Sequence, residues 1–260
     1  MKTLISNLVL CLILVSGAFA QNSNYNYVLF EFMSVDDAQG SNYAEIEEYW
    51  SKIHEQRIAD GSIVGWDLWS LAPADTEGPQ YLTVTLFKTL DQMLAAVDLD
   101  QIMNYAKAAH NSSQKEIDEM MAKTVASRDI MSSMYLKILS STINSPDMHP
   151  GIYATIDFMK QLDENYERME DQIFRIWHQQ SVDEGDKMNW SMTRVILPAG
   201  SDVYATHITV SMYENRQQLA RDLEAEEDNS DYMSVMAASG GIQTRDLRRK
   251  LIGQLLMMVR

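Results

Sequence analysis

The sequence predicts an α+β protein built from two copies of one βαββαβ unit, and three observations support this prediction. A strand-like run that begins at Tyr27 (Tyr-Val-Leu-Phe-Glu-Phe-Met) returns 126 residues later at Tyr153 (Tyr-Ala-Thr-Ile-Asp-Phe-Met). The stretch from His54 to Trp66 returns as His178 to Trp190 at a spacing of 124. An Arg-Asp motif near the end of each copy is also repeated, in 127–130 and 244–247. Two long copies in the same order indicate two equivalent folding units rather than a solenoid, which needs three or more short repeats.

The first twenty residues are expected to be a secretory signal peptide. Lys2 precedes the apolar run Leu8 to Val15, and Ala18-Phe19-Ala20 supplies the small residues for cleavage before Gln21. The only cysteine, Cys11, lies in this segment, so the mature protein is expected to be free of cysteine. Disulfides, thiolate metal sites and a cysteine nucleophile are thereby excluded. No later run is long and apolar enough for a membrane anchor, so we expect a secreted or periplasmic protein.

The mature chain is strongly acidic. Removal of Lys2 with the signal peptide takes the formal charge from −16 to −17. Such a surface repels phosphate backbones, so nucleic acid is not an expected partner. The expected partner is a small-molecule ligand, and the sequence does not specify an oligomeric state.

In the first copy, the elements follow from periodicity. Residues 27–33 alternate in polarity as a strand does, and the next segment carries a helical apolar stripe that ends at Gly61. Two strands joined by a turn follow, then a broken helical region, then a closing strand, with expected ranges 63–71, 81–87, 90–126 and 130–139.

The second copy repeats this order. Its strand at 153–159 precedes a helix that ends at Gly185, and the later elements are expected at 188–197, 204–213, 217–238 and 247–258. Proline residues at 146 and 150 mark the linker. The predicted organisation is therefore a signal peptide (1–20), a first unit (21–140), a linker (141–150) and a second unit (151–260).

The order βαββαβ is that of a ferredoxin-like unit, with both helices on one face of an antiparallel sheet. Two such sheets can cover each other by closing into one barrel with the helices outside. The paired strands, helix ends and Arg-Asp motifs quoted above resemble the dimeric α+β barrel superfamily in its tandem-duplicated form, which includes antibiotic-biosynthesis-type monooxygenases and NIPSNAP-like proteins. The resemblance covers nearly the whole mature chain, but the fold alone does not specify function.

Strand alternation then predicts which side chains line the barrel. If the most apolar set, such as Val28, Phe30 and Phe32, faces the helices, the opposite set faces inward. That inward set would hold two carboxylates, an imidazole, hydroxyls and four tyrosines, which is the composition of a ligand cavity. The residues expected to bind a ligand from this set are Tyr27, Tyr81, Tyr153 and Tyr213.

Three titratable residues of this inward set are candidates for catalysis: Glu31, Asp157 and His207. Carboxylates in an apolar cavity can act as general acid or base. Alternatively, Arg128 and Arg245 hold the two carboxylates in structural ion pairs, and hydroxyl or backbone partners satisfy His207. The sequence leaves both interpretations open.

A histidine and a tryptophan recur at matching positions of the two copies. His54 and His178 lie about 80° from the centre of their helix stripes, at the rim of the helix–sheet interface, so each can point into a cavity mouth or bond a strand end. Trp66 and Trp190 are expected to be core or cavity-wall residues, and all four residues are candidates for ligand binding.

No motif for a metal is present, because His54-Glu55 lacks a second histidine at position 58. No cofactor is predicted. The resemblance makes haem an alternative, since haem binding by a barrel histidine occurs in that superfamily.

The predicted function is the binding of a small, partly aromatic or apolar molecule inside the barrel. If the protein is an enzyme, the resemblance implies a cofactor-independent oxygenase or isomerase. The alternative is a non-catalytic packing or interaction protein with a filled barrel.

Overall fold

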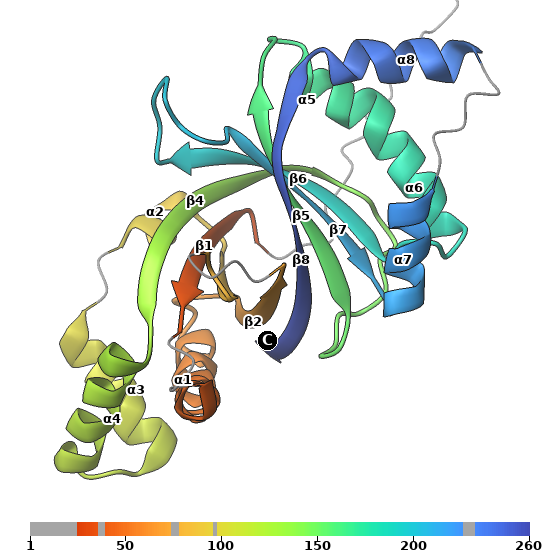
Figure 1. Cartoon of the computed structure of the whole chain (residues 1–260). Coiled ribbons are helices and arrows are strands. Elements are labelled where there is room, and N and C mark those ends of the chain that lie inside the picture. Colours follow the sequence, from red (N-terminus) through yellow and green to blue (C-terminus); the bar gives the residue numbers. More distant parts are fainter. Residues whose placement is uncertain (1–24, 36–39, 74–77, 96–97, 226–231) are drawn as a thin grey trace, which may run out of the picture.

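A computed structural model describes residues 25–35, 40–73, 78–95, 98–225 and 232–260, and Figure 1 shows their arrangement. The predicted signal peptide and its cleavage site lie outside these residues. No helix in the described part of the chain is long and apolar enough to cross a membrane.

The elements of the first unit occur in the predicted order. They are β1 (Tyr27–Ser34), α1 (Gly40–Ala59), β2 (Gly65–Ala72), β3 (Tyr81–Phe87), α2 (Leu90–Leu94), α3 (Leu99–His110), α4 (Gln114–Ser127) and β4 (Asp129–Ser141). The broken helical region of the sequence is thus three helices. Each begins at a side-chain cap: Thr89, Asp98 and Ser113 accept hydrogen bonds from backbone N–H groups of the following turn.

The second unit repeats the series with one difference in its first helix. Its elements are β5 (Tyr153–Gln161), α5 (Tyr166–Met169), η2 (Glu170–Phe174), α6 (Arg175–Asp183), β6 (Asn189–Leu197), β7 (His207–Tyr213), α7 (Arg216–Glu224), α8 (Tyr232–Ile242) and β8 (Arg245–Val259). Here α5, η2 and α6 form one continuous helix interrupted by a π-helical turn.

The strands form one closed antiparallel barrel in the order β1-β3-β2-β8-β5-β7-β6-β4. Each unit contributes four neighbouring strands in the ferredoxin-like order, and the last strand of each unit closes the ring. Strand β4 pairs with β1 of its own unit and with β6 of the other, and β8 pairs likewise with β5 and β2. Figure 1 shows α1, α3 and α4 on one side of the barrel and α5 to α8 on the other. The predicted fold class is confirmed.

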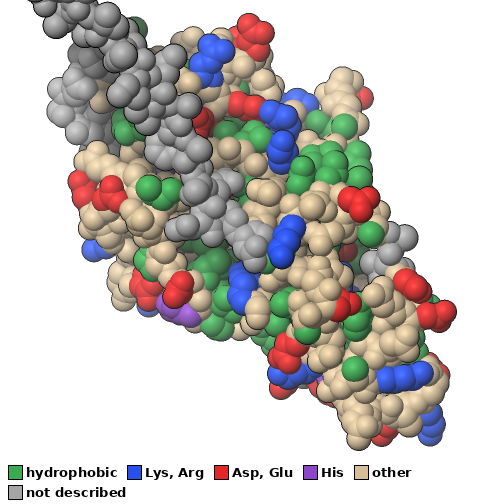
Figure 2. Space-filling view, turned by 180° about the vertical axis from the view of Figure 1, so that it is seen from behind, with side chains coloured by type: hydrophobic (Ala, Val, Ile, Leu, Met, Phe, Trp, Pro, Cys, Tyr) green, Lys and Arg blue, Asp and Glu red, His purple; other side chains and the backbone are tan. Residues whose placement is uncertain are grey.

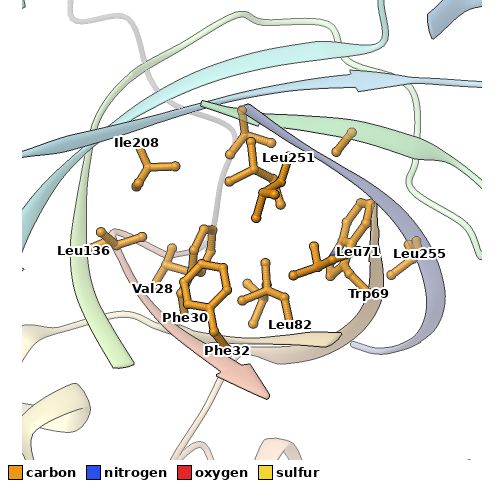
Figure 3. Packing of buried hydrophobic residues seen from close by; sticks show 14 of the residues in the cluster. Val28, Phe30, Phe32, Trp69, Leu71, Leu82, Leu136, Ile208, Leu251 and Leu255 are labelled. Carbon is orange, nitrogen blue, oxygen red and sulfur yellow. The ribbon is translucent and has the colours of Figure 1, made fainter. Parts of the chain in front are cut away.

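The barrel interior is filled by apolar side chains from both units. Figure 3 shows Val28, Phe30, Phe32 and Ile208 pointing toward the barrel axis. The same buried cluster contains Ala154, Ile156 and Phe158 of β5 and Leu82, Val84 and Leu86 of β3. Rings from the two units touch, since the centroids of Phe32 and Phe158 are 5.7 Å apart.

The predicted assignment of the strand faces was therefore wrong. The two alternating sets were separated correctly, but the apolar set lines the barrel and the polar set faces the helices. The residues expected inside and found outside are Tyr27, Glu31, Tyr81, Tyr153, Asp157, His207 and Tyr213. The ligand cavity expected around them inside the barrel is occupied by the apolar core.

The physical reason is the difference in enclosure between the two sides of the sheet. A closed barrel of eight strands is just wide enough for side chains to fill it, and the ring of strands surrounds its interior. Helices cover the outer face only in part, so polar groups there can reach partners or solvent. The more apolar set consequently gains more by facing inward.

The surface carries charges of both signs. On the face shown in Figure 2, Lys and Arg side chains alternate with Asp and Glu, and hydrophobic side chains show between them. Acidic and basic side chains are therefore mixed on this face (Figure 2) rather than gathered in a patch of one sign.

Candidate functional site

The predicted site residues form two separate groups on the outer face of the barrel, one under the helices of each unit. Strands β1 and β5 lie on opposite sides of the closed ring, so Glu31 and Asp157 do not share a cavity. The first group contains Tyr27, Glu31, His54, Trp66 and Tyr81. The second group contains Tyr153, Asp157, His178, Trp190, His207 and Tyr213.

A buried ion pair joins helix and strand in each unit. Arg128, next to β4, pairs with Glu47 of α1, and Arg245 of β8 pairs with Glu170 of η2. Both glutamates are only 1% exposed. The sequence interpretation that these arginines pair with Glu31 and Asp157 was wrong about the partners, because the helix supplies the carboxylate.

Sequence reasoning missed these glutamates, although a signal for them was present. Tyr43 and Glu47 recur as Tyr166 and Glu170 at a common spacing of 123, whereas the histidines that follow recur at 124. The second helix thus holds one extra residue between its glutamate and its histidine. The π-helical turn η2 absorbs it, and such turns frequently lie at functional sites.

The two matched histidines stack on the two matched tryptophans. The ring centroids are 4.8 Å apart for His54 and Trp66 and 4.9 Å apart for His178 and Trp190. A cationic side chain approaches Nδ1 of each: Arg57 Nη1 at 3.3 Å from His54, and Lys187 Nζ at 3.2 Å from His178. Burial and these cations lower both histidine pKa values, that of His178 to about 3.

This environment predicts a pH dependence of stability. An unfolded histidine titrates near pH 6.5, and folded His178 near 3. Between these values the unfolded chain binds more protons, so the free energy of unfolding falls as pH falls through this window, by at most about 1.4 kcal/mol per pH unit. Urea unfolding at pH 7.5, 6 and 5 should show a shallower fall for His178→Phe than for the wild type.

The control for this prediction is His149→Phe. His149 is exposed, and the Pro150 carbonyl and Glu214 raise its pKa, so its removal should not flatten the curve. An unchanged slope in His178→Phe would contradict the assignment.

His207 is held on both ring nitrogens. Its Nε2 lies 2.9 Å from Glu167 Oε1, and its Nδ1 lies 3.0 Å from Thr206 Oγ1. Arg194 binds the same glutamate through its Nε at 2.7 Å. Burial lowers the His207 pKa, while Glu167 acts in the opposite direction. This geometry favours the interpretation of His207 as a satisfied core histidine.

Glu31 of the first unit has a partner, and so does the tyrosine beside it. Thr83 Oγ1 donates to Glu31 Oε2 at 3.5 Å, and the Tyr43 hydroxyl donates to the sulfur of Met33 at 3.4 Å. Burial raises the pKa of Glu31, and Arg128 opposes this shift.

The corresponding groups of the second unit differ. Asp157 Oδ2 lies 3.1 Å from Lys250 Nζ, but Asp157 Oδ1 and the Tyr166 hydroxyl are buried and have no hydrogen-bond partner among the described residues. Burial raises the pKa of both groups, and the charge of Asp157 contributes to the shift of Tyr166. Beside them lies an apolar cluster of Met159, Tyr166, Trp190 and Met192. Two free polar atoms next to an apolar wall are a composition suited to a ligand.

The four tyrosines expected to bind a ligand lie in different environments. Tyr213 is buried, and its hydroxyl donates to Asp222 Oδ2 at 2.5 Å, while Lys187 lies 3.1 Å from the other oxygen of this carboxylate. Tyr153 is partly buried at the start of β5, and Asp157 lies in the middle of this strand. In the first group, Tyr27 and Tyr81 pack against the cluster around Trp66.

The described histidines near the barrel do not fit an axial ligand of haem. Arg and Lys can only donate, so Nδ1 of His54 and of His178 must accept, which places the proton of each neutral ring on Nε2. Neither nitrogen is then free to bind iron, and both nitrogens of His207 are engaged. No group of three or more His, Cys, Asp or Glu residues suited to a metal ion occurs in the described part of the chain.

Comparisons with known proteins agree with the architecture. No protein-family model and no curated protein matches the sequence. Among solved structures, a proposed monooxygenase from Fusobacterium nucleatum superposes with a TM-score of 0.55 at 9% identity, over 90% of this chain and 94% of that one. An anthrone oxidase-like protein gives 0.53 at 10% identity, over 92% and 94%.

A haem-binding protein from Thermus thermophilus gives a TM-score of 0.51 at 12% identity, over 90% of this chain and 92% of that one. At these identities the likeness is one of fold. The chain therefore has the dimeric α+β barrel fold, with both halves of the barrel supplied by one polypeptide.

Proposed function

We propose that the second unit binds a small, partly aromatic or apolar molecule between its first helix and the sheet, with Asp157 as the proton acceptor. The observation that carries this proposal is the pair of buried polar atoms, Asp157 Oδ1 and the Tyr166 hydroxyl, that lack partners in the described structure. At the equivalent positions of the first unit, Glu31 and Tyr43 both have partners. The two units thus differ where a ligand would bind.

The electrostatics of these groups suit proton abstraction beside a carbonyl. Burial raises the pKa of Asp157, which makes it a stronger base than a surface aspartate, while Lys250 keeps it ionised. Burial also raises the pKa of Tyr166, so its hydroxyl stays protonated and can donate to a substrate oxygen. Return of the proton to another carbon would be an isomerase reaction, and attack of the carbanion on O₂ an oxygenase reaction.

The fold likeness to a proposed monooxygenase and to an anthrone oxidase-like protein supports the oxygenase form. With anthrone as the probe, Asp157 would take a proton from the ring CH₂, and the resulting carbanion would reduce O₂. One anthrone and one O₂ then give one anthraquinone and one water, so no other co-reactant is required. Tyr166 would hold the anthrone oxygen, on which negative charge develops.

We expect the protein to accelerate anthraquinone formation with one O₂ consumed per product. Asp157→Asn should lower the rate by about 10²- to 10⁴-fold, because a general base typically contributes this factor. Product absorbance and an oxygen electrode measure the two quantities. Glu31→Gln is the matched control, since it alters the equivalent carboxylate of the first unit, which accepts a hydrogen bond from Thr83, and its rate should be unchanged. Full activity of Asp157→Asn would refute the role of Asp157.

Binding can be tested separately from turnover. Native mass spectrometry of the chain from Gln21, purified from its own host, should reveal a bound mass that is lost on denaturation and in Asp157→Asn, but kept in Glu31→Gln. An adduct that survives both substitutions would place the ligand elsewhere.

The second candidate function is a non-catalytic packing or interaction protein. It is favoured by the apolar filling of the barrel interior and by outward polar groups that already have partners, such as His207 and Tyr213. An absence of both turnover and adduct would favour this function. Under either function we propose export, which the apolar run after Lys2 supports.

A further inference from the structure

A groove of about 840 Å³ opens at one end of the barrel, on residues that the proposed function does not use. The starts of β1, β2, β5 and β6 and the ends of β3, β4, β7 and β8 meet at this end. The wall includes residues of both units and of the segment from Ser141 to Met148 that joins them. We call it the barrel-mouth groove. Its volume is within the range of small-molecule sites.

The wall of the barrel-mouth groove is apolar and rich in methionine. Met148, Met188, Met212 and Met258 line it together with Tyr25 and Ile138. These residues belong to or pack against the apolar cluster that fills the barrel, so the floor of the groove is continuous with the core. Thioether side chains adapt their shape and make favourable contacts with aromatic rings. This wall suits a flat aromatic or chain-like apolar molecule.

The charges at the groove do not favour an anion. The guanidinium of Arg260 is bound on both sides by buried Asp67, with Nη1 2.7 Å from Oδ1 and Nη2 3.1 Å from Oδ2. Its charge is thereby neutralised within the protein. Asp147 on the rim adds a negative charge. An anionic ligand would meet no free cation among the described lining residues.

The rim provides neutral hydrogen-bonding groups. The amide Nδ2 of Asn189 donates to Ser145 Oγ at 2.7 Å, and Asn144 and Ser191 also line the groove. An amide carbonyl that is not used in this bond can accept from a hydroxyl or N–H of a ligand. We propose that the barrel-mouth groove is a second ligand site, which binds an uncharged, largely apolar or aromatic molecule with one hydrogen-bonding end.

The segment that precedes Tyr25 is the alternative occupant of the barrel-mouth groove. After cleavage before Gln21, the remaining residues are Gln21-Asn-Ser-Asn24, which carry no apolar side chain and match the apolar wall poorly. A small molecule from outside the chain is therefore the occupant that the chemistry favours.

The test uses the chain from Gln21 and N-phenyl-1-naphthylamine, an uncharged dye that fluoresces in apolar sites. We expect saturable binding of one dye per chain. Ser191→Trp should fill the groove and weaken binding about tenfold or more, and Asn189→Trp on the rim should do the same with less risk to folding. Ser132→Trp, at an exposed position of β4 toward the other end of the barrel, is the matched control and should bind as the wild type does.

Five results would overturn the proposal, four with the neutral dye and one with its sulfonated analogue. With the neutral dye, these are the absence of saturable binding, equal binding by both groove variants and the wild type, and equal weakening by Ser132→Trp. The fourth is tighter dye binding, by about tenfold or more, when residues 21–24 are deleted, because this segment would then be the occupant of the groove. The sulfonated analogue 8-anilinonaphthalene-1-sulfonate should bind at least about tenfold more weakly than the neutral dye, and equal affinity would refute the uncharged class. Asp157→Asn should leave dye binding unchanged, which separates this site from the proposed function.

Discussion

Arg245→Ala is expected to lower the free energy of unfolding by about 3–5 kcal/mol, because it leaves a buried carboxylate without its partner. Glu170 is 1% exposed and pairs with Arg245, which ties η2 to the first residue of β8. A charge in this position cannot be solvated by water once the guanidinium is removed. Chemical denaturation of wild type and variant at pH 7 measures the difference.

The double variant Arg245→Met with Glu170→Met tests whether the loss comes from the unpaired charge. Replacing both partners by apolar groups removes the uncompensated carboxylate, so we expect it to recover most of the stability. The matched control is Arg248→Ala on the same strand. Arg248 pairs with Asp246, and both side chains are more than 40% exposed, so the expected loss is at most about 1 kcal/mol. Equal losses in Arg245→Ala and Arg248→Ala would show that burial of the pair does not determine its effect.

Phe32→Ala is expected to destabilise the protein by about 3–5 kcal/mol, as is usual for loss of a buried phenyl ring. Phe32 is 2% exposed and lies inside the barrel against Phe158 of the other unit. Phe158→Ala should cost a similar amount, whereas Ile130→Ala, at a side chain that is 55% exposed, should change stability by about 0.5 kcal/mol or less.

The coupling between the two rings distinguishes the two possible assignments of the strand faces. Contact across the barrel should appear in a double-mutant cycle as a coupling of about 0.5–1.5 kcal/mol between Phe32 and Phe158. If these rings faced the helices of their own units, they would lie on opposite sides of the barrel and their effects would add. Additive losses would therefore contradict the inward position of the apolar set.

The elements and their order could be predicted from the sequence because their signals are local. Alternation in Tyr27–Met33, the stop at Gly61 and the turn before Tyr81 depend on residues a few positions apart. Duplication strengthened each signal, since a pattern that is weak evidence when it occurs once becomes stronger when it returns in the same order. The βαββαβ order then restricted the fold to two four-stranded sheets that cover each other.

The candidate site could be predicted only in part. The residues of the polar face were identified as a set, and Asp157 was among them. Its distinction from Glu31 was not available, because it depends on whether Thr83, Met33 or Lys250 reaches the polar atoms in three dimensions. The partner of Arg245 was missed for the same reason, since Glu170 lies 75 residues away in the chain.

The sequence by itself determined the order of the strands and helical regions, the two-fold repeat and the division of each strand into an apolar and a polar face. Only the tertiary structure decided which face lines the barrel. Alternation of apolar and polar residues shows that the two faces of a strand differ. The pattern is the same whichever of the two faces points into the barrel. The choice depends on closure of the ring, which surrounds one side of the sheet with strands and leaves the other to helices that cover it in part. That closure placed the apolar set inside and the polar set, with Asp157, in the layer beneath the helices, to which α5 adds Tyr166.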